Sequence, residues 1–187
     1  KKKKFDFVIF DLGLSSLQIF NLERGFSFNS KSKIDMRMGL NSLSAHEVIN
    51  NFSLSTLTDI IKYLGEEKES YSIAKNIIRE RDKGSISSIP DLIKIIKTSK
   101  KKDFKKKINI STKTFQAIRI FVNKEFSELI EGLISATELI KAGGKIIVIS
   151  FHSIEDKIVK FFFTNYSKNK SNVSRYYPDL SKKKIFV

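Results

Sequence analysis

The pattern of apolar residues predicts two strands, one on either side of a long helical region. Residues 5–10 form an almost unbroken run of strand-forming side chains, which stops at Asp11. A second run covers residues 145–151 and stops at His152. Strands that are apolar on both faces are typical of a parallel sheet buried between two layers of helices. The pattern therefore predicts an α/β fold with a doubly wound sheet.

Between the two strands, apolar residues recur at helical spacing. Ser44 and Glu47 form a capping-box pattern before the first helix, and Pro90 stands where a later helix begins. Four short helices are predicted between residues 44 and 102. They would form a small all-helical domain inserted into the sheet domain.

The second strand is predicted to lie inside a crossover unit. A long apolar stripe predicts one helix over residues 113–141, and Gly143-Gly144 would turn the chain into the strand. Ser153 is expected to cap a final helix that runs to about Tyr166. Three segments are therefore expected: the first part of the sheet core at 1–40, the helical insertion at 41–111 and the second part of the core at 112–187.

The composition is strongly basic, with 35 Lys and Arg against 20 Asp and Glu and a formal net charge of +15. Such a charge favours a polyanionic partner such as RNA, DNA or an anionic membrane surface. However, the basic residues are mostly lysine in a chain rich in Ile, Asn, Ser and Phe, which an AT-rich genome would also encode. The densest block, residues 100–107, is equally compatible with a phosphate-contacting loop and a solvated linker.

Several classes of protein are excluded or disfavoured. No uncharged apolar run approaches the roughly 20 residues that span a bilayer. The absence of cysteine excludes disulfides and thiolate metal sites and fits a cytoplasmic location. Two histidines, His46 and His152, are too few and too far apart to indicate a zinc site. No phosphate-binding loop, dinucleotide glycine motif or nucleophile elbow occurs, so nothing supports phosphoryl transfer or serine hydrolysis.

Polar residues follow both predicted strands. Asp11 ends the first, while Ser150, His152 and Ser153 stand at the end of the second. Neighbouring parallel strands would bring these residues to one edge of the sheet, where α/β proteins bind their ligands. For Asp11 the alternative is a helix N-cap or turn role.

The segment after the first strand has little periodicity. Gly25 indicates a turn, and Asp35 and Arg37 put opposite charges two residues apart in an apolar setting. Loops after strand ends are where functional residues concentrate. A structural loop tied by a surface ion pair is the alternative.

Six short motifs then occur in a fixed order. They are Asp11-Leu12-Gly13-Leu14-Ser15-Ser16-Leu17-Gln18, Glu23-Arg24-Gly25-Phe26-Ser27-Phe28, Asp35-Met36-Arg37-Met38, Tyr63-Leu64-Gly65-Glu66-Glu67, Thr114-Phe115-Gln116-Ala117-Ile118-Arg119 and Ser150-Phe151-His152-Ser153-Ile154-Glu155-Asp156. Together they resemble the bacterial small-subunit ribosomal RNA cytosine-N4 methyltransferase family, known as RsmH or MraW. The likeness covers residues 5–166.

The resemblance implies an enzyme that uses S-adenosyl-L-methionine to methylate the exocyclic amine of a cytosine in the decoding region of 16S rRNA. It implies a Rossmann-like methyltransferase core interrupted by a helical substrate-recognition domain. Asp11 and Gln18 stand at the two positions that contact the cofactor in the family. The implied partner is 16S rRNA in the small ribosomal subunit, with no membrane and no metal; a homodimer is left open.

The sequence departs from the family in several places. The glycine-rich segment that cradles the methionine end of the cofactor is missing, as are the acidic residue that reads its ribose and the basic C-terminus. We therefore expect this fragment alone to bind the cofactor poorly and to be inactive. Leu17 stands where proline is common, and Asn109-Ile110 where His-Pro is usual.

A cytosine N4 amine is a poor nucleophile, because its lone pair is delocalised into the ring. The reaction needs positioning and hydrogen-bond acceptors rather than a metal or a covalent intermediate. The candidates for these acceptors are Ser15, Ser16, Asp35, Ser150, His152 and Ser153. Arginines that could hold phosphates or bases are Arg24, Arg37 and Arg119.

Two other functions remain as alternatives. An RNA-binding or ribosome-assembly module on a degenerate methyltransferase scaffold would carry the same basic charge, but it would not need Asp11 and Gln18. A Rossmann-like enzyme acting on a small molecule is disfavoured by the helical insertion and the lysine block.

Overall fold

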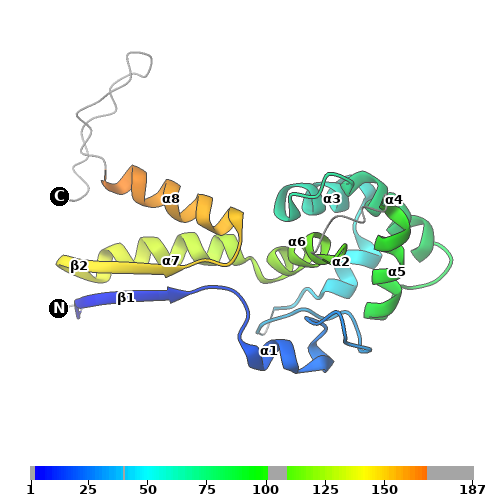
Figure 1. The fold of residues 1–187 in the computed structure, drawn as a ribbon, viewed down its shortest axis with the longest axis horizontal. Coiled ribbons are helices and arrows are strands. Elements are labelled where there is room, and N and C mark those ends of the chain that lie inside the picture. The colour runs from blue at the N-terminus through cyan, green and yellow to red at the C-terminus, as the bar shows by residue number, and fades with distance from the viewer. Residues whose placement is uncertain (1–2, 40, 101–108, 168–187) are drawn as a thin grey trace, which may run out of the picture. The chain divides into compact units, whose positions relative to one another are not determined.

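The computed structural model describes residues 3–39, 41–100 and 109–167. All of the predicted lysine block except Lys100 lies outside the described residues. The chain divides into two compact units, shown in Figure 1. The sheet unit comprises Lys1–Gly13 and Phe126–Val187, and the helical unit comprises Leu14–Glu125.

The sheet unit is built on two parallel strands, as predicted. Strand β1 (Phe5–Asp11) pairs with β2 (Ile140–Ile149) in a register that sets Asp11 beside Ile149. β2 begins earlier than predicted, and Gly143 lies inside it with a φ of 78°. The predicted glycine turn is therefore a local irregularity, which shifts the register between Phe5 and Phe7.

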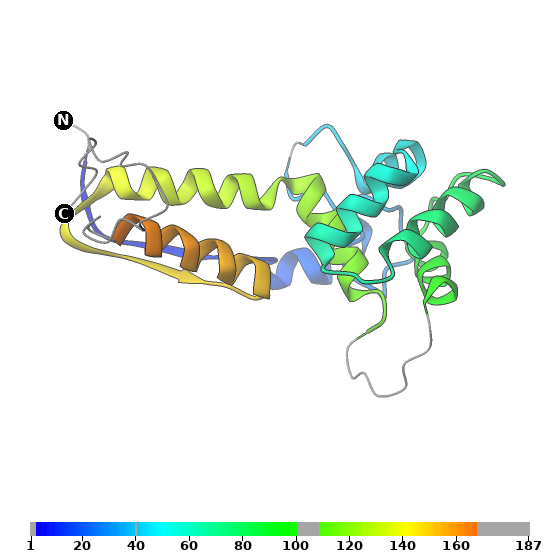
Figure 2. The ribbon, with the colours of Figure 1, turned by 90° about the horizontal axis from the view of Figure 1, so that it is seen from above.

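Among the described residues, helices cover one face of this sheet. α7 (Glu125–Leu139) and α8 (Ser153–Ser167) run beside the strands, as Figure 2 shows. Leu133 of α7 and Phe162 of α8 are buried and form a cluster with the half-buried Phe10 of β1. The covered face thus consists of alternate residues of each strand, as expected for a half-buried sheet.

The opposite face is apolar and exposed, which corrects the prediction of strands buried on both sides. The exposed fractions are 60% for Phe7, 64% for Ile9, 43% for Ile147 and 47% for Ile149. Within the part of the chain that the structure describes, no helix packs on these side chains. The continuous apolar run could not reveal this, because it reports the residue types on both faces and not what covers them.

The helical unit contains the predicted short helices and some further turns. Its elements are α1 (Ser16–Phe20), η1 (Leu22–Arg24), α2 (Ala45–Asn51), α3 (Leu54–Asp59), the π-helical η2 (Ile60–Leu64), α4 (Ser70–Arg81), α5 (Ile89–Ser99) and α6 (Thr112–Asn123). The Ser44–Glu47 capping box at α2 is confirmed, and Ser88 caps α5 just before Pro90. One apolar cluster holds α2 to α6 together; Leu57, Ile77, Ile96 and Ile118 are fully buried in it.

The helix predicted over residues 113–141 is two helices. Lys124 adopts a left-handed conformation with a φ of 51° and separates α6 from α7. α6 packs in the helical unit, which spans Leu14–Glu125 and is therefore wider than the expected insertion at 41–111. The functional domain limits stay a prediction. Across the described ranges, none of the helices is long and apolar enough to cross a bilayer.

Candidate functional site

The carboxyl edge of the sheet brings together the residues that end the two strands. Leu12 donates its backbone N–H to the carbonyl of Ile149 at 3.1 Å, which continues the pairing beyond Asp11. The Asp11 side chain is exposed. Ser150 follows directly after β2 and is half-buried. The predicted meeting of the two strand ends is confirmed by the pairing of Asp11 with Ile149, while a contact of Asp11 with Ser150, His152 or Ser153 stays a prediction.

The aromatic ring of Phe151 packs against a glycine turn at this edge. Gly13 has a φ of +87°, a conformation that L side chains rarely adopt, and a Cβ there would lie 3.2 Å from Cδ2 of Phe151. The ring of Phe151 therefore packs directly against the backbone of Gly13. Nevertheless, 68% of Phe151 is exposed. Asp11 is followed closely by a turn that an aromatic side chain partly covers.

A buried carboxylate fixes the start of α8. Glu155 is only 3% exposed, and its Oε2 accepts the backbone N–H of Phe151 at 2.9 Å. Its Oε1 lies 3.2 Å from Nε2 of His152, although the two atoms are not aligned for a hydrogen bond. Because Nδ1 of His152 accepts the backbone N–H of Glu155 at 3.4 Å, both ring nitrogens of His152 face Glu155.

These contacts revise the roles of two predicted residues. The carbonyl of His152 accepts the N–H of Asp156 at 3.2 Å, so His152 rather than Ser153 caps α8. Ser153 is the first helical residue. Sequence reasoning did not select Glu155 or Phe151 as site residues, although both stand in the last motif; the burial of one and the exposure of the other are set by the tertiary structure.

Gln18 lies at the start of the helical unit. Its Oε1 accepts the backbone N–H of Ser15 at 2.8 Å, while the Ser15 hydroxyl accepts the N–H of Gln18 at 3.3 Å, which makes a capping box for α1. Asp11 belongs to the sheet unit and Gln18 to the helical unit. Their joint role in cofactor binding stays a prediction.

The loop before α2 is held in an unusual conformation. Met36 is buried and has a φ of 57°, which costs energy for a side chain of this size. Asn123 of α6 stabilises it: its Nδ2 donates to the carbonyl of Met36 and its Oδ1 accepts the N–H of Met38, both at 2.7 Å. Arg24 donates to the carbonyls of Arg37 and Met38 at 2.8 and 2.9 Å. The loop is thus a rigid, strained segment.

Asp35 and Arg37 form the expected ion pair, with 2.5 Å between Oδ1 and Nε. The Asp35 carboxylate raises the pKa of Arg37, first through the hydrogen bond and then through its charge. Arg119 is bound by Glu125 at 2.8 and 2.9 Å in a two-point contact. All three predicted RNA-contacting arginines thus have intramolecular partners, and their contact with RNA stays a prediction.

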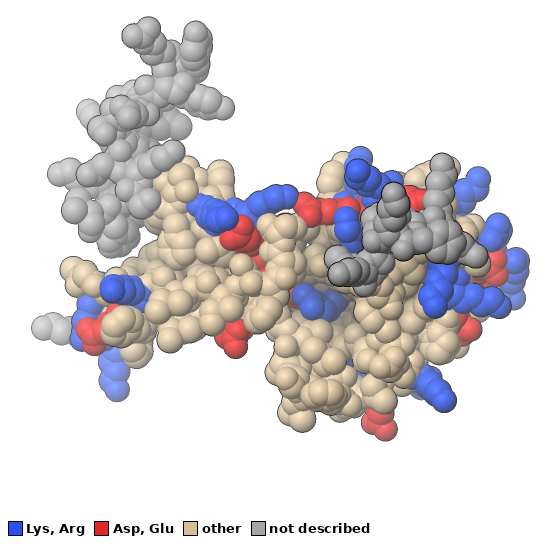
Figure 3. Space-filling model, viewed as in Figure 1, with Lys and Arg blue, Asp and Glu red and all other residues tan. Residues whose placement is uncertain are grey.

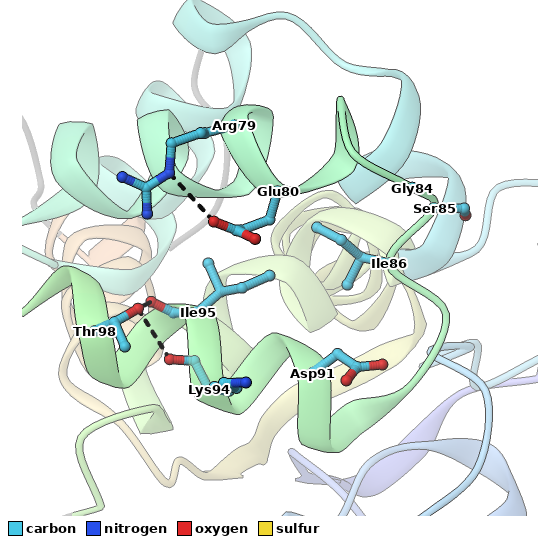
Figure 4. A pocket seen from close by; sticks show the side chains of 9 residues that line it. All are labelled: Arg79, Glu80, Gly84, Ser85, Ile86, Asp91, Lys94, Ile95 and Thr98. Atoms are coloured by element: carbon cyan, nitrogen blue, oxygen red, sulfur yellow. Dashed lines mark hydrogen bonds and ion pairs between the residues drawn. The ribbon is translucent and has the colours of Figure 1, made fainter.

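Exposed basic side chains gather elsewhere in the helical unit, over α4 and α5, as Figure 3 shows. A hollow of about 330 Å³ lies between these helices, with Arg79 on one side and Lys94 on the other (Figure 4). Arg79 and Lys83 are paired with Glu80, whose pKa is lowered chiefly by the hydrogen bond from Lys83. Among the described residues, no ion pair involves Lys94.

The comparison with known proteins decides the family. The MraW methylase family matches residues 1–184. The chain belongs to the MraW methylase family. Its motifs at the carboxyl edge of the sheet and in the loop before α2 are therefore those of a methylase family, as the resemblance implied.

Similar proteins carry a name that states an activity. The chain is 44% identical over 173 residues to the "Ribosomal RNA small subunit methyltransferase H" of Sinorhizobium medicae (strain WSM419), covering 92% of this chain and 50% of that protein. It is 43% identical over 180 residues to the protein of the same name from Rickettsia massiliae (strain Mtu5), covering 96% and 58%. Against that of Ehrlichia canis (strain Jake), identity is 45% over 162 residues, covering 86% and 54%. The chain thus spans about half the length of these relatives.

Proposed function

We propose that the full-length protein uses S-adenosyl-L-methionine to methylate the N4 amine of a cytosine in 16S rRNA of the small ribosomal subunit. The observation that carries this proposal is the family match over residues 1–184. The names of relatives at 43–45% identity supply the class of substrate. A Rossmann-like core and a cytoplasmic location are part of the same proposal.

The carboxyl edge of the sheet suits one side of a cofactor site. The exposed Asp11 carboxylate stands at the end of β1, two residues before the glycine turn at Gly13. We assign Asp11 to cofactor contact, with Gln18 as its proposed companion. The cofactor supplies an electrophilic methyl group when bound. The residues of this chain hold and orient it beside the amine.

The amine must lose a proton when it gains a methyl group, so acceptors near it matter. Ser150 follows directly after β2, whose last residue Ile149 pairs with Asp11, and it is the candidate that we favour. His152 is less suited, because both of its ring nitrogens face Glu155. Ser153 and Asp35 remain candidates, although Asp35 is already paired with Arg37.

The α4–α5 face is our candidate for binding the RNA backbone. Lys94 and Lys97 are exposed on α5 three residues apart, which sets them on one side of the helix. Since these lysines have no acidic partner among the described residues, their charge is available to phosphates. The hollow beside Lys94 would let a backbone segment lie between the two helices (Figure 4).

The test is transfer of tritium from methyl-labelled S-adenosyl-L-methionine by the full-length protein. Small ribosomal subunits that lack the modification serve as substrate, and large subunits serve as the control. We expect label in the RNA of the small subunits alone. Binding to the small subunit without any transfer would instead support an RNA-binding or assembly module.

A further inference from the structure

We propose that the ring of Phe151 is a stacking surface for the target base of single-stranded RNA. The inference rests on the proposed function and adds a base-binding residue to it. Phe151 is two residues beyond Ile149, the partner of Asp11 in the sheet. The ring therefore lies at the edge where the methyl group would be transferred.

Phe151 is exposed at a different place from the apolar sheet face, because it lies beyond the end of β2. Phe7, Ile9 and Ile147 are exposed because no described helix covers their side of a regular strand. Phe151 comes after the end of β2, in the turn that leads to α8, and 68% of it is exposed. An exposed ring at the edge where α/β proteins bind their ligands is open to a planar partner.

The position of Phe151 is fixed from two sides. Glu155, itself buried, accepts the backbone N–H of Phe151 at 2.9 Å. The ring packs against Gly13, where any side chain would push it away or strain the turn, because a Cβ would lie 3.2 Å from it. A ring held in this way is preorganised, so little of the stacking free energy is spent on ordering it.

The chemistry of the target fits such a surface. A cytosine that reaches a methyl donor must leave its own stack, and an aromatic side chain replaces part of that stacking. The exocyclic amine of cytosine has two N–H donors. Ser150, proposed above as their acceptor, follows directly after β2 and precedes Phe151 in the chain. The expected ligand is thus a pyrimidine base with an amino group, presented on single-stranded RNA.

The first experiment uses Phe151→Ala, Phe151→Leu and Phe151→Tyr in the full-length protein. The affinity for a short single-stranded RNA that contains the target cytosine is measured separately from the affinity for S-adenosyl-L-methionine. We expect the Ala and Leu variants to bind the RNA about tenfold more weakly, while the Tyr variant keeps its affinity. Phe161→Ala is the matched control, since Phe161 is 73% exposed on α8.

A spectroscopic probe separates stacking from folding. The chain contains no tryptophan, so Phe151→Trp and, as a control, Phe161→Trp each introduce a new fluorophore. We expect RNA with the target cytosine to quench the signal added by Phe151→Trp, and RNA with an abasic residue at that position to leave it unchanged. Neither RNA should affect the Phe161→Trp signal.

Three results would overturn the inference. If the cofactor alone quenches Phe151→Trp and Phe151→Ala loses cofactor affinity, the ring stacks on the adenine of the cofactor instead. If no variant changes RNA affinity, the ring is not a stacking surface. Equal weakening by Phe151→Ala and Phe161→Ala would indicate a general effect of exposed rings. Because none of these measurements needs methyl transfer, failure of the proposed enzyme activity would be seen separately.

Discussion

Glu155 and Phe151 are joined by a hydrogen bond of 2.9 Å from the backbone N–H of Phe151 to the buried carboxylate. The bond closes the turn between β2 and α8, so the turn residue Phe151 and the first turn of α8 hold each other in place. Replacing Glu155 with Ala would leave this half-buried N–H without its acceptor. We expect the free energy of unfolding to fall by about 2 kcal/mol, measured by urea denaturation.

Glu155→Gln is the matched variant, because its side-chain oxygen can still accept the N–H of Phe151. It should lose less stability than the Ala variant. If both variants unfold at the same urea concentration as the unmodified protein, the contact does not stabilise the turn.

The hydrogen bonds of Asn123 to Met36 and Met38 give a second test. Asn123→Ala removes the donor to the Met36 carbonyl and the acceptor for the Met38 N–H, while the left-handed Met36 keeps its strain. We expect the free energy of unfolding to fall by about 2–3 kcal/mol, since a buried carbonyl and a half-buried N–H are left without partners. Thermal unfolding followed by circular dichroism measures it. Asn29→Ala, at an exposed position of the same unit, should change the melting temperature little.

The capping box of α2 makes stability depend on pH. Hydrogen bonds from Ser44, first from its backbone N–H and then from its hydroxyl, hold the pKa of Glu47 below its ordinary value of 4.5. A lowered pKa in the folded state means that the stabilisation is complete above about pH 4.5 and is lost as pH falls through the folded pKa.

Glu47→Gln should therefore be less stable than the unmodified protein at pH 7, and the difference should shrink as the pH is lowered below 4.5. Denaturation curves of both proteins from pH 7 to pH 3 measure this. A difference that stays constant over that range would show that the ionised carboxylate contributes nothing.

Our proposal that the α4–α5 face binds RNA predicts a change in the salt dependence of binding. Lys94→Gln with Lys97→Gln should weaken binding to single-stranded RNA and reduce the slope of log affinity against log salt by about 0.7 for each phosphate that a lysine no longer neutralises. Lys145→Gln, on β2 of the sheet unit, is the control. An unchanged slope in the double variant would place the phosphate-binding side chains elsewhere in the protein.

Much of this structure could be predicted from local signals in the sequence. The apolar run before Asp11, the Ser44–Glu47 pattern and Ser88 before Pro90 each predict an element that the structure contains, because strand propensity and helix caps act over a few residues. The meeting of the two strand ends could also be predicted, since parallel pairing follows from the crossover helix.

Other features depend on contacts that sequence spacing does not show. The break at Lys124 interrupts a continuous apolar stripe, so the pattern alone favours one helix. Glu155 has the spacing of an ordinary first-turn acid; only its burial beneath the turn distinguishes it. Arg24, Arg37 and Arg119 are predicted to contact RNA. In the structure they bind the Arg37 carbonyl, Asp35 and Glu125, respectively, and the sequence alone does not show these contacts.

The most direct test of the account is nucleoside analysis of 16S rRNA after incubation of unmodified small subunits with the full-length protein and S-adenosyl-L-methionine. We predict N4-methylcytidine with the unmodified protein and with Asp6→Ala, an exposed acid of the same strand, but none with Asp11→Ala. Undiminished N4-methylcytidine with Asp11→Ala would contradict the assigned cofactor contact. Methylation of another atom, or of none, by the unmodified protein would contradict the proposed reaction.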